Sequence, residues 1–437
     1  MKRTLVDTGI PWLGEIPDNW SLVPLKGVLQ ERKENNDPIK TDFILSLGVR
    51  YGIVPYSEKE GGGNKAKEDC SQYRLAYPGD IVMNSMNIIS GSVAISNYFG
   101  CVSPVYYMFY PKDATTADAR YFCYVFQSKA FQRSLLGLGN GILMKESSNG
   151  VFNTVRMRIS VNKLKPLILP VPSYEEQQRI VDFLDEKCRY IDSIIEKTRG
   201  TIEEYKKLQQ AIITQAVTQG LSEEATMKDS ELGWIQQIPS HWETIPSKYL
   251  FKESTRWREE DDVMLTSSVK YGIISQEEYK RLENVNLVTA TKETEKWKHV
   301  DPNDFIISLM SFKSGLEISY VTGCITWHYI VLKAAKEICH EYYKWLFKSE
   351  AYITAIRRTC NFIRNGQDLR YSNFTQVPLI VPPIDEQRAI AAYVEKKVKH
   401  MDALIAQKEL YVQELEAYKF SLIYEYVTGK KEVPACQ

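Results

Sequence analysis

The sequence lacks the patterns that usually reveal a metal site, a disulfide framework or a membrane span. Its eight cysteines are scattered singly, with no C-x-x-C, and its five histidines form no H-E-x-x-H, whereas zinc sites and disulfide frameworks need close, repeated spacings. No run of about 18 apolar residues is present, which excludes an ordinary membrane helix. The first ten residues hold no apolar signal region. By default, we expect a cytoplasmic protein without a bound metal.

An excess of charge of one sign is also missing. The chain has 55 Lys and Arg against 55 Asp and Glu, so no global field directs it towards nucleic acid or membrane. Apolar residues make up 44% and charged residues 25% of its 437 residues, which is typical of folded domains. At roughly 150 residues per domain, the length indicates about three units.

Motifs of common enzymes are absent as well. There is no G-x-x-x-x-G-K-[ST] phosphate loop. The single Pro-Pro, in Val381–Ile384, has neither the polar residue nor the aromatic that amino-group methyltransferases place around it. The glycines of Gly137–Gly141 lack the preceding strand and the acidic residue about 20 positions later that a dinucleotide loop requires. We therefore predict a non-catalytic chain.

What the sequence does contain is a duplication. The segment Asp7–Trp20 returns as Asp229–Trp242, with both tryptophans, the isoleucine and the proline 222 residues later. Four of the eight tryptophans fall in this motif, which makes coincidence a poor explanation. Further repeated pairs are Tyr51–Ile53 with Tyr271–Ile273, Glu176-Gln177 with Glu386-Gln387, and Val217-Thr218 with Val427-Thr428.

The front of each repeat, over residues 20–165 and 242–375, indicates a mixed α/β module of about 150 residues. Short apolar runs broken by turn residues predict strands, and apolar residues at helical spacing predict helices between them. The expected strands are 80–84, 92–96, 102–109 and 304–308, and the expected helices are 119–137 and 339–359.

The back of each repeat predicts one long helix, over residues 173–218 and 383–428. Ser173–Glu176 forms a capping box, Pro383 suits a first helical position, and Gly220 and Gly429 suit the positions after the helix ends. About 46 residues would extend about 70 Å, so each helix needs a partner, and the obvious one is its own repeat. The expected apolar seam has the spacing of a coiled coil and comprises residues 180, 184, 191, 194, 195, 202, 205, 208 and 212, then 390, 394, 401, 404, 405, 412, 415, 418 and 422.

This seam is imperfect, and two interpretations remain open. It is either a tolerant two-stranded coil, or a pair that leaves apolar surface for the helices of another chain. On the second interpretation, the candidate subunit-interface residues are Tyr205, Leu208, Tyr411 and Tyr418.

Local excesses of basic residues fall in both front modules. Residues 119–170 hold eight basic side chains against one acidic, and residues 351–381 hold four arginines against one aspartate. The glycine-rich loop Gly61–Lys67 allows close approach of the backbone to a phosphate or a base edge. Most charge runs are simply solvated surface, but arginine is a good bidentate reader of guanine and phosphate. The candidate DNA-binding residues are Lys65, Lys67, Arg133, Lys145, Arg156, Arg158, Arg357, Arg358, Arg364 and Arg370.

The duplicated order of motifs resembles the specificity subunit of type I restriction-modification systems. The resembling pattern, D-[TS]-x3-W-x3-I-P-x2-W, then P-x3-E-Q before a long helix closed by Val-Thr, occurs twice and covers essentially the whole chain. One departure is Pro172–Tyr174, where the family usually has a second proline. The matching residues are Trp12, Ile16, Pro17, Trp20, Glu176 and Gln177 in the first repeat, and Trp234, Ile238, Pro239, Trp242, Glu386 and Gln387 in the second.

The resemblance implies two α/β target recognition domains, over residues 1–170 and 221–381. It also implies two long helices, one over 171–220 and one, followed by a tail, over 382–437, that form an antiparallel coiled coil with pseudo-two-fold symmetry. Such a chain would bind a bipartite site in double-stranded DNA and would scaffold two modification (methyltransferase) subunits and the restriction (endonuclease and translocase) subunits. S-adenosylmethionine, ATP and Mg are expected on those partners, with no cofactor on this chain. The alternatives are a helical adaptor that does not bind DNA, and the specificity subunit of a split-site enzyme with a fused restriction and methylation partner.

Overall fold

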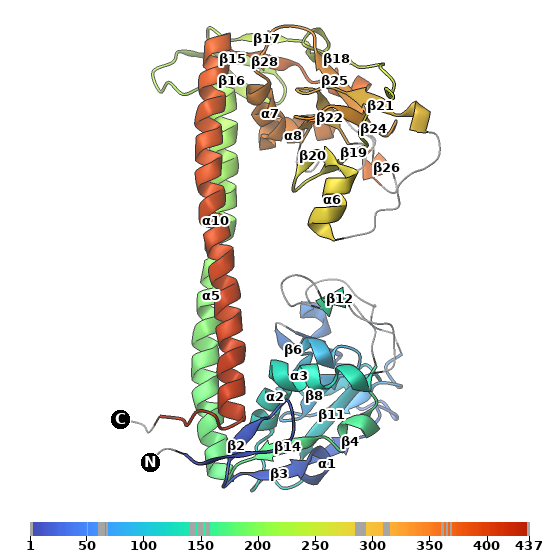
Figure 1. Cartoon of the computed structure of the whole chain (residues 1–437), viewed down its shortest axis with the longest axis vertical. Helices are drawn as coiled ribbons and strands as arrows, with labels where there is room; N and C mark the ends of the chain where they lie inside the picture. The colour runs from blue at the N-terminus through green and yellow to red at the C-terminus, as the bar shows by residue number, and fades with distance from the viewer. Residues whose placement is uncertain are drawn as a thin grey trace. The chain divides into compact units, whose positions relative to one another are not determined.

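The computed structural model describes residues 3–49, 51–59, 66, 69–139, 145–146, 152–153, 158–284, 294–308, 315–359, 362–363, 366–367 and 369–434. The chain forms two units, each assembled from segments that are distant in sequence. Unit 1 holds residues 1–198 and 410–437, and unit 2 holds residues 199–409. Each unit therefore contains one α/β module and a part of each long helix, as Figure 1 shows. In the described ranges, no helix is both long enough and apolar enough to cross a membrane.

The module of unit 1 is built on a four-stranded antiparallel sheet in the order β4-β11-β8-β9. Strand β8 lies inside it, and its apolar residues are fully buried on both faces: Ile81 and Met83 join the main core, while Val82 joins a smaller cluster. This division follows from the alternation of side chains along a strand. The sheet strands are β4 (Leu29–Arg32), β8 (Ile81–Asn84), β9 (Val93–Ile95) and β11 (Tyr106–Pro111).

Unit 2 repeats this topology in the order β18-β25-β22-β23. Strand β22 divides in the same way as β8, because Phe305 and Ile307 enter the main core and Ile306 enters a smaller cluster. The four strands are β18 (Phe251–Glu253), β22 (Phe305–Ile307), β23 (Glu317–Ile318) and β25 (Ile330–Ala334).

Paired two-stranded elements surround both sheets and also occur twice. In unit 1 they are β1 (Leu5–Asp7) with β2 (Glu15–Pro17), β3 (Ser21–Pro24) with β14 (Ile168–Val171), β5 (Leu45–Gly48) with β6 (Gly52–Pro55), β7 (Arg74–Ala76) with β10 (Gly100–Val102), and β12 (Lys145–Glu146) with β13 (Phe152–Asn153). In unit 2 they are β15 (Met227–Leu232) with β16 (Ile235–Pro239), β17 (Glu243–Ile245) with β28 (Leu379–Val381), β19 (Leu265–Ser268) with β20 (Gly272–Ser275), β21 (Lys298–Val300) with β24 (Gly323–Ile325), and β26 (Phe362–Ile363) with β27 (Gly366–Gln367).

Each of the two predicted module helices is broken by a serine. Ser128 separates α2 (Ala119–Gln127) from α3 (Lys129–Ser134), and Ser349 separates α7 (His340–Lys348) from α8 (Glu350–Arg358). The Ser349 hydroxyl donates to the Leu346 carbonyl at 2.7 Å and accepts from the Tyr352 amide at 3.3 Å. A serine that hydrogen-bonds to the backbone in this way ends one helix and caps the next. The predicted strand 102–109 is likewise broken, because β10 ends at Val102 and β11 begins at Tyr106. The remaining short helices are α1 (Leu25–Val28), α4 (Val161–Leu164), α6 (Gln276–Glu283) and α9 (Tyr371–Phe374).

The two long helices, α5 (Tyr174–Gln219) and α10 (Ile384–Val427), confirm the sequence prediction. Each is followed by a glycine with positive φ, Gly220 at 78° and Gly429 at 70°, a conformation that glycine adopts without strain. In unit 1, Asp192 of α5 pairs with Lys419 of α10 at 2.6 Å. In unit 2, Gln209 of α5 donates to Asp402 of α10 at 2.8 Å. Within each unit, therefore, the helices run antiparallel.

The repeated Trp and Glu-Gln motifs join each module to the start of a long helix. The Glu176 carboxylate accepts from the Trp20 indole at 3.1 Å, and Glu386 accepts from Trp242 at 2.9 Å. The predicted capping box is therefore only half right, since Ser173 accepts from the Glu176 amide at 3.3 Å while the Glu176 carboxylate bonds Trp20 instead. Gln177, which is fully buried, accepts from the Asp118 amide and donates to the Thr116 carbonyl, and Gln387 accepts from the Cys339 amide.

Each module also holds the end of the other long helix, through a buried tyrosine. In unit 1 the Tyr121 hydroxyl lies 3.0 Å from the Val427 carbonyl, and in unit 2 the Tyr342 hydroxyl donates to the Val217 carbonyl at 2.7 Å. Carbonyls in the last turn of a helix have no helical donor, so these hydroxyls supply it. Each unit therefore contains the start of the long helix from its own repeat and the end of the long helix from the other repeat.

Candidate nucleic-acid interface

Several of the basic side chains counted in residues 119–170 have structural partners. Arg120 pairs with Asp118 at 2.9 Å, Lys165 pairs with Glu31 at 2.9 Å, and Lys163 donates to the Leu138 carbonyl at 2.8 Å. Lys129 lies over the ring of Phe420 at 4.4 Å. The basic excess available to DNA in unit 1 is therefore smaller than the sequence count indicates.

The described DNA-binding candidates of unit 1 are Arg133 and Arg158, and both are exposed. Arg133 lies near the end of α3. Arg158 directly precedes Ile159, which is fully buried and whose carbonyl accepts from the Tyr107 hydroxyl at 3.1 Å. The backbone of Lys145 lies in β12, opposite Asn153. The candidates Lys65, Lys67 and Arg156 lie outside the described residues, as does the side chain of Lys145.

In unit 2 the structure brings three predicted arginines to one end of the module. Arg357 and Arg358 end α8, and Arg370 precedes α9. The Asn373 side chain connects the two helices, since it accepts from the Arg370 amide at 2.9 Å and donates to the Thr359 carbonyl. Arg358 and Arg370 are exposed, and Arg357 is half-buried. Arg364 lies outside the described residues.

Each module also contains a buried ionic centre that serves the fold. In unit 1, Arg32 pairs with the buried Asp80 at 2.7 Å and stacks between Tyr77 and Tyr110. At the equivalent turn of unit 2, Asp304 pairs with Lys333 at 2.9 Å. Because these carboxylates and cations neutralise one another, we assign them to stability and not to DNA binding.

His299 extends the ionic centre of unit 2 and is only 2% exposed. Its Nδ1 lies 2.9 Å from Asp262 and its Nε2 lies 2.9 Å from Asp301. Burial acts to lower the pKa of His299, but the hydrogen bonds to Asp262 and Asp301 outweigh it and hold the pKa above its ordinary value. Hydrogen bonds from Lys333, the largest contributor, and from His299 lower the pKa of Asp301 to about 2. Over the described residues, no group of three or more acidic, histidine or cysteine side chains could hold a metal ion.

Three of the four candidate subunit-interface residues lie on the surface of the helix pair. Leu208 is 51% exposed, Tyr411 45% and Tyr418 57%. Their exposure corrects the predicted seam, because Leu208 and Tyr418 do not pack between the helices. Tyr205 is half-buried, with Lys408 over its ring at 5.6 Å.

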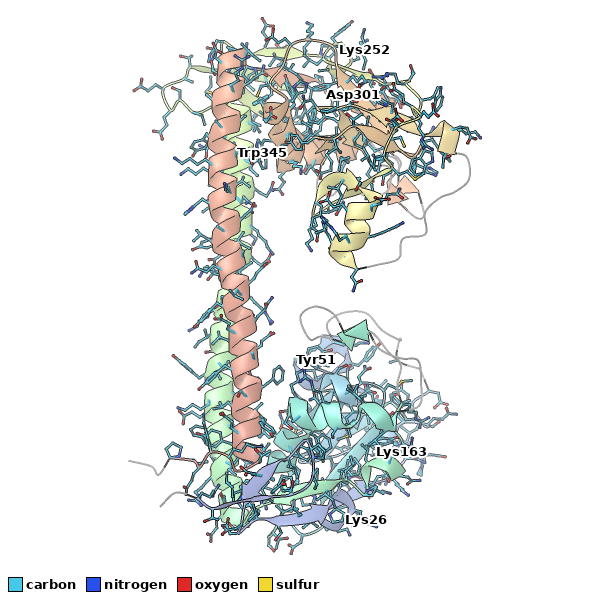
Figure 2. All side chains as sticks on the ribbon, viewed as in Figure 1. Lys26, Tyr51, Lys163, Lys252, Asp301 and Trp345 are labelled. Carbon is cyan, nitrogen blue, oxygen red and sulfur yellow. The ribbon has the colours of Figure 1, made fainter. Side chains whose placement is uncertain are left out.

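A repeated hairpin tip is a candidate that sequence reasoning left unassigned. The β5–β6 and β19–β20 hairpins carry Val49 and Val269 at their tips, 56% and 69% exposed. Each is followed by a basic residue and then by Tyr51 or Tyr271; Figure 2 labels Tyr51. The repeated Tyr-Gly-Ile was visible in the sequence, but its position at a tip was not.

Comparison with known proteins finds a family match for the first repeat. Residues 17–204 match the family described as the type I restriction modification DNA specificity domain. The first repeat thus carries a match to a type I restriction-modification specificity domain. In type I restriction-modification systems the specificity subunit is the non-catalytic component, and the enzymatic activities lie in partner subunits. The match favours DNA specificity within such a system over a helical adaptor that does not bind DNA.

Relatives extend the likeness over the whole chain. A protein of Methanocaldococcus jannaschii, whose name assigns it as the specificity subunit of the type I restriction enzyme MjaX, is 23% identical over 446 residues and covers 96% of each chain. A solved structure described under complex assembly and conformational transition of the type I R-M system covers 95% of this chain and 99% of its own, with a TM-score of 0.65 and 13% identity. The HsdS subunit of Thermoanaerobacter tengcongensis covers 95% and 98%, with a TM-score of 0.47 and 13% identity.

Proposed function

We propose that the chain recognises a bipartite sequence in double-stranded DNA, and that each module reads one part of the site. The observation that supports this most is the repeated sheet, β4-β11-β8-β9 in unit 1 and β18-β25-β22-β23 in unit 2. One framework used twice, with different side chains on it, is what two readers of different half-sites need. Phosphate contacts position such a reader, and side chains at base edges supply its specificity.

The arginines at the ends of α8 and α9 are the proposed DNA contacts of the second reader. Arg358 and Arg370 are exposed, and Asn373 joins the two helices that carry them. Arg133 and Arg158 are the corresponding proposal for the first reader. A bidentate arginine contact to a base is worth about 1–3 kcal/mol of discrimination.

The long helices are the proposed spacer between the readers. Helix α5 has 46 residues and α10 has 44, which corresponds to about 66–69 Å at a rise of 1.5 Å per residue. Both run without interruption from their first residue to their last. A spacer of continuous helix makes the gap in the DNA site a defined length.

Two modification subunits are the proposed partners of the helix pair, with restriction subunits joining the same complex. The exposed apolar positions Leu208 and Tyr418 support this, because they occupy equivalent places 210 residues apart in the two repeats. Equivalent positions suit two copies of one partner. S-adenosylmethionine, ATP and Mg belong to these partners in the proposal, and this chain binds none of them.

Adenine methylation in a host with and without the gene identifies the site. The purified full-length chain is then titrated with duplexes carrying the cognate site, each half-site alone, and a scrambled sequence. Arg370→Ala is expected to weaken binding to the cognate duplex and to relax specificity in one half-site only. Arg189→Ala, which removes an exposed arginine from α5, is the matched control. Equal affinity of the wild type for the cognate and scrambled duplexes, with and without the modification subunit, would contradict the proposed function.

A further inference from the structure

One hydrogen bond recurs at the same place in both modules. In unit 1 the Lys163 amine donates to the Leu138 carbonyl at 2.8 Å. In unit 2 the Asn373 amide donates to the Thr359 carbonyl. The donors are the third residues of α4 and α9, and each acceptor is the tenth residue after the serine that ends the first module helix. The two bonds are therefore equivalent, although a lysine makes one and an asparagine the other. Figure 2 labels Lys163 on the module of unit 1.

Each bond closes the base of a segment whose length differs between the repeats. Leu138 and Lys163 are 25 positions apart, whereas Thr359 and Asn373 are 14 positions apart. Over residues 1–138, the shift between matching residues of the two repeats varies only between 220 and 224. Across these segments it falls from 221 to 210. The largest difference in length between the two modules therefore lies between the bonded ends.

The same segments contain half of the candidate DNA-binding residues. Those residues are Lys145, Arg156 and Arg158 within 139–162, and Arg364 and Arg370 within 360–372. Two modules that read different half-sites must differ where they meet the bases, because side chains at base edges carry the sequence information. A segment of different length on a shared framework meets this requirement.

Both ends of each segment are anchored in the core of its module. In unit 1, Leu135 precedes the segment and Leu164 follows it, and both side chains are fully buried. In unit 2 the corresponding side chains, Ile356 and Phe374, are also fully buried. The points at which each segment leaves and rejoins the module are therefore held by packing.

In unit 2 the bond between the ends also holds the backbone of a candidate arginine. Thr359 directly follows α8, where carbonyls have no helical donor, and Asn373 supplies one. The same Asn373 side chain accepts from the Arg370 amide at 2.9 Å. One side chain thus connects the first end of the segment to the arginine at its second end.

We propose that Lys163 and Asn373 are positioning residues for DNA recognition, because the bond between the ends of each segment determines how its arginines are presented to the half-site. Neither residue has to contact DNA for this role. The inference rests on the proposed function and adds that one shared bond positions two recognition segments of different length. Loss of one bond should therefore affect one half-site only.

The test measures discrimination at each half-site by the full-length chain. Binding to the cognate duplex is compared with binding to two duplexes, each with base changes in one half-site. Asn373→Ala is expected to lower discrimination at the half-site read by unit 2 by about fivefold or more, which is the value of a weaker bidentate base contact. Discrimination at the other half-site should stay at the wild-type level. Lys163→Met is expected to have the reverse effect.

Variants that keep a donor test the bond itself. Asn373→Lys installs the donor that unit 1 uses, and Lys163→Arg keeps a long cationic donor. We expect each to retain more discrimination than Asn373→Ala or Lys163→Met does. Gln376→Ala is the matched control in unit 2, since this amide donates to the Ser372 carbonyl at 3.1 Å, four residues away, and does not join the segment ends. It should leave both half-sites unchanged.

A second control separates positioning from stability in unit 1. The Lys430 amine donates to the Leu13 carbonyl at 2.7 Å, so Lys430→Met also removes a lysine that bonds to the backbone. We expect Lys430→Met to lower the Tm without changing discrimination at either half-site. Lys163→Met should change discrimination at one half-site even when the two variants have the same Tm.

Two outcomes would overturn the inference. One is wild-type discrimination at both half-sites by Asn373→Ala and by Lys163→Met. The other is an equal loss of affinity for the cognate and scrambled duplexes by Lys163→Met, with the slope of log Kobs against log salt reduced by about 0.9, which would make Lys163 itself a phosphate contact. Failure of the proposed function looks different, because the wild type itself would then bind the cognate and scrambled duplexes equally.

Discussion

The hydrogen bond from Tyr342 to the end of α5 can be tested with a matched pair of single-atom deletions. Tyr342 is fully buried, and its hydroxyl donates to the Val217 carbonyl at 2.7 Å. Tyr342→Phe removes only the oxygen and leaves a carbonyl in the last turn of α5 without this donor. A buried polar group deprived of its partner costs about 1–3 kcal/mol. For a unit of this size, each kcal/mol lowers the Tm by about 2–4 °C.

Tyr352 supplies the control in the same module. It is also fully buried, but its hydroxyl has no hydrogen-bond partner in the described residues. Tyr352→Phe deletes the same atom and relieves an unsatisfied group, so we expect the free energy of unfolding to stay the same or to rise. The assay is calorimetry and urea denaturation of both full-length variants. Equal destabilisation by the two substitutions would refute the reasoning that the Tyr342 bond holds the helix end.

Three further predictions follow from the same structure. Removal of about four residues, one turn, from one long helix should change the preferred gap between the half-sites, and an unchanged gap in the methylated sites would show that the helices are not the spacer. Leu208→Asp and Tyr418→Asp should each weaken co-purification of the modification subunit without lowering the Tm, because both side chains are about half exposed; wild-type assembly by both variants would reject the interface. The pKa of His299 is raised, so its contribution to stability is complete below its ordinary pKa of 6.5 and is lost as the pH rises through the raised value. In thermal melts, the Tm of His299→Gln should lie well below that of the wild type near pH 6 and closer to it near pH 9. A difference in Tm that does not change with pH would contradict this.

The framework was predictable from the sequence because duplication marks what both units share. The repeated tryptophans and Glu-Gln pairs proved to be contacting partners, Trp20 with Glu176 and Trp242 with Glu386. The long helices could be bounded to within a residue or two, because caps and terminal glycines are local signals. The break of the module helices at Ser128 and Ser349 was missed because apolar spacing continues across it.

The candidate interface was less predictable because charge counts ignore partners that the fold brings close. Lys165 meets Glu31 only because β3 and β14 pair, and the separation in sequence hides it. The place of Leu208 in the predicted seam was wrong for a related reason. In the sequence, an apolar residue that packs in the seam looks the same as an apolar residue that lies one position away from it and is exposed.

The tyrosine contacts to the helix ends also determine the order in which the two units can fold. Most of unit 1 precedes unit 2 in the sequence, yet its core includes Leu422, Tyr426 and Val427 from the end of α10. Until those residues leave the ribosome, the first module presents an open apolar surface where they will dock. Unit 2, drawn wholly from residues 199–409, can be complete while unit 1 still waits. The half that is translated first is therefore the half that folds last.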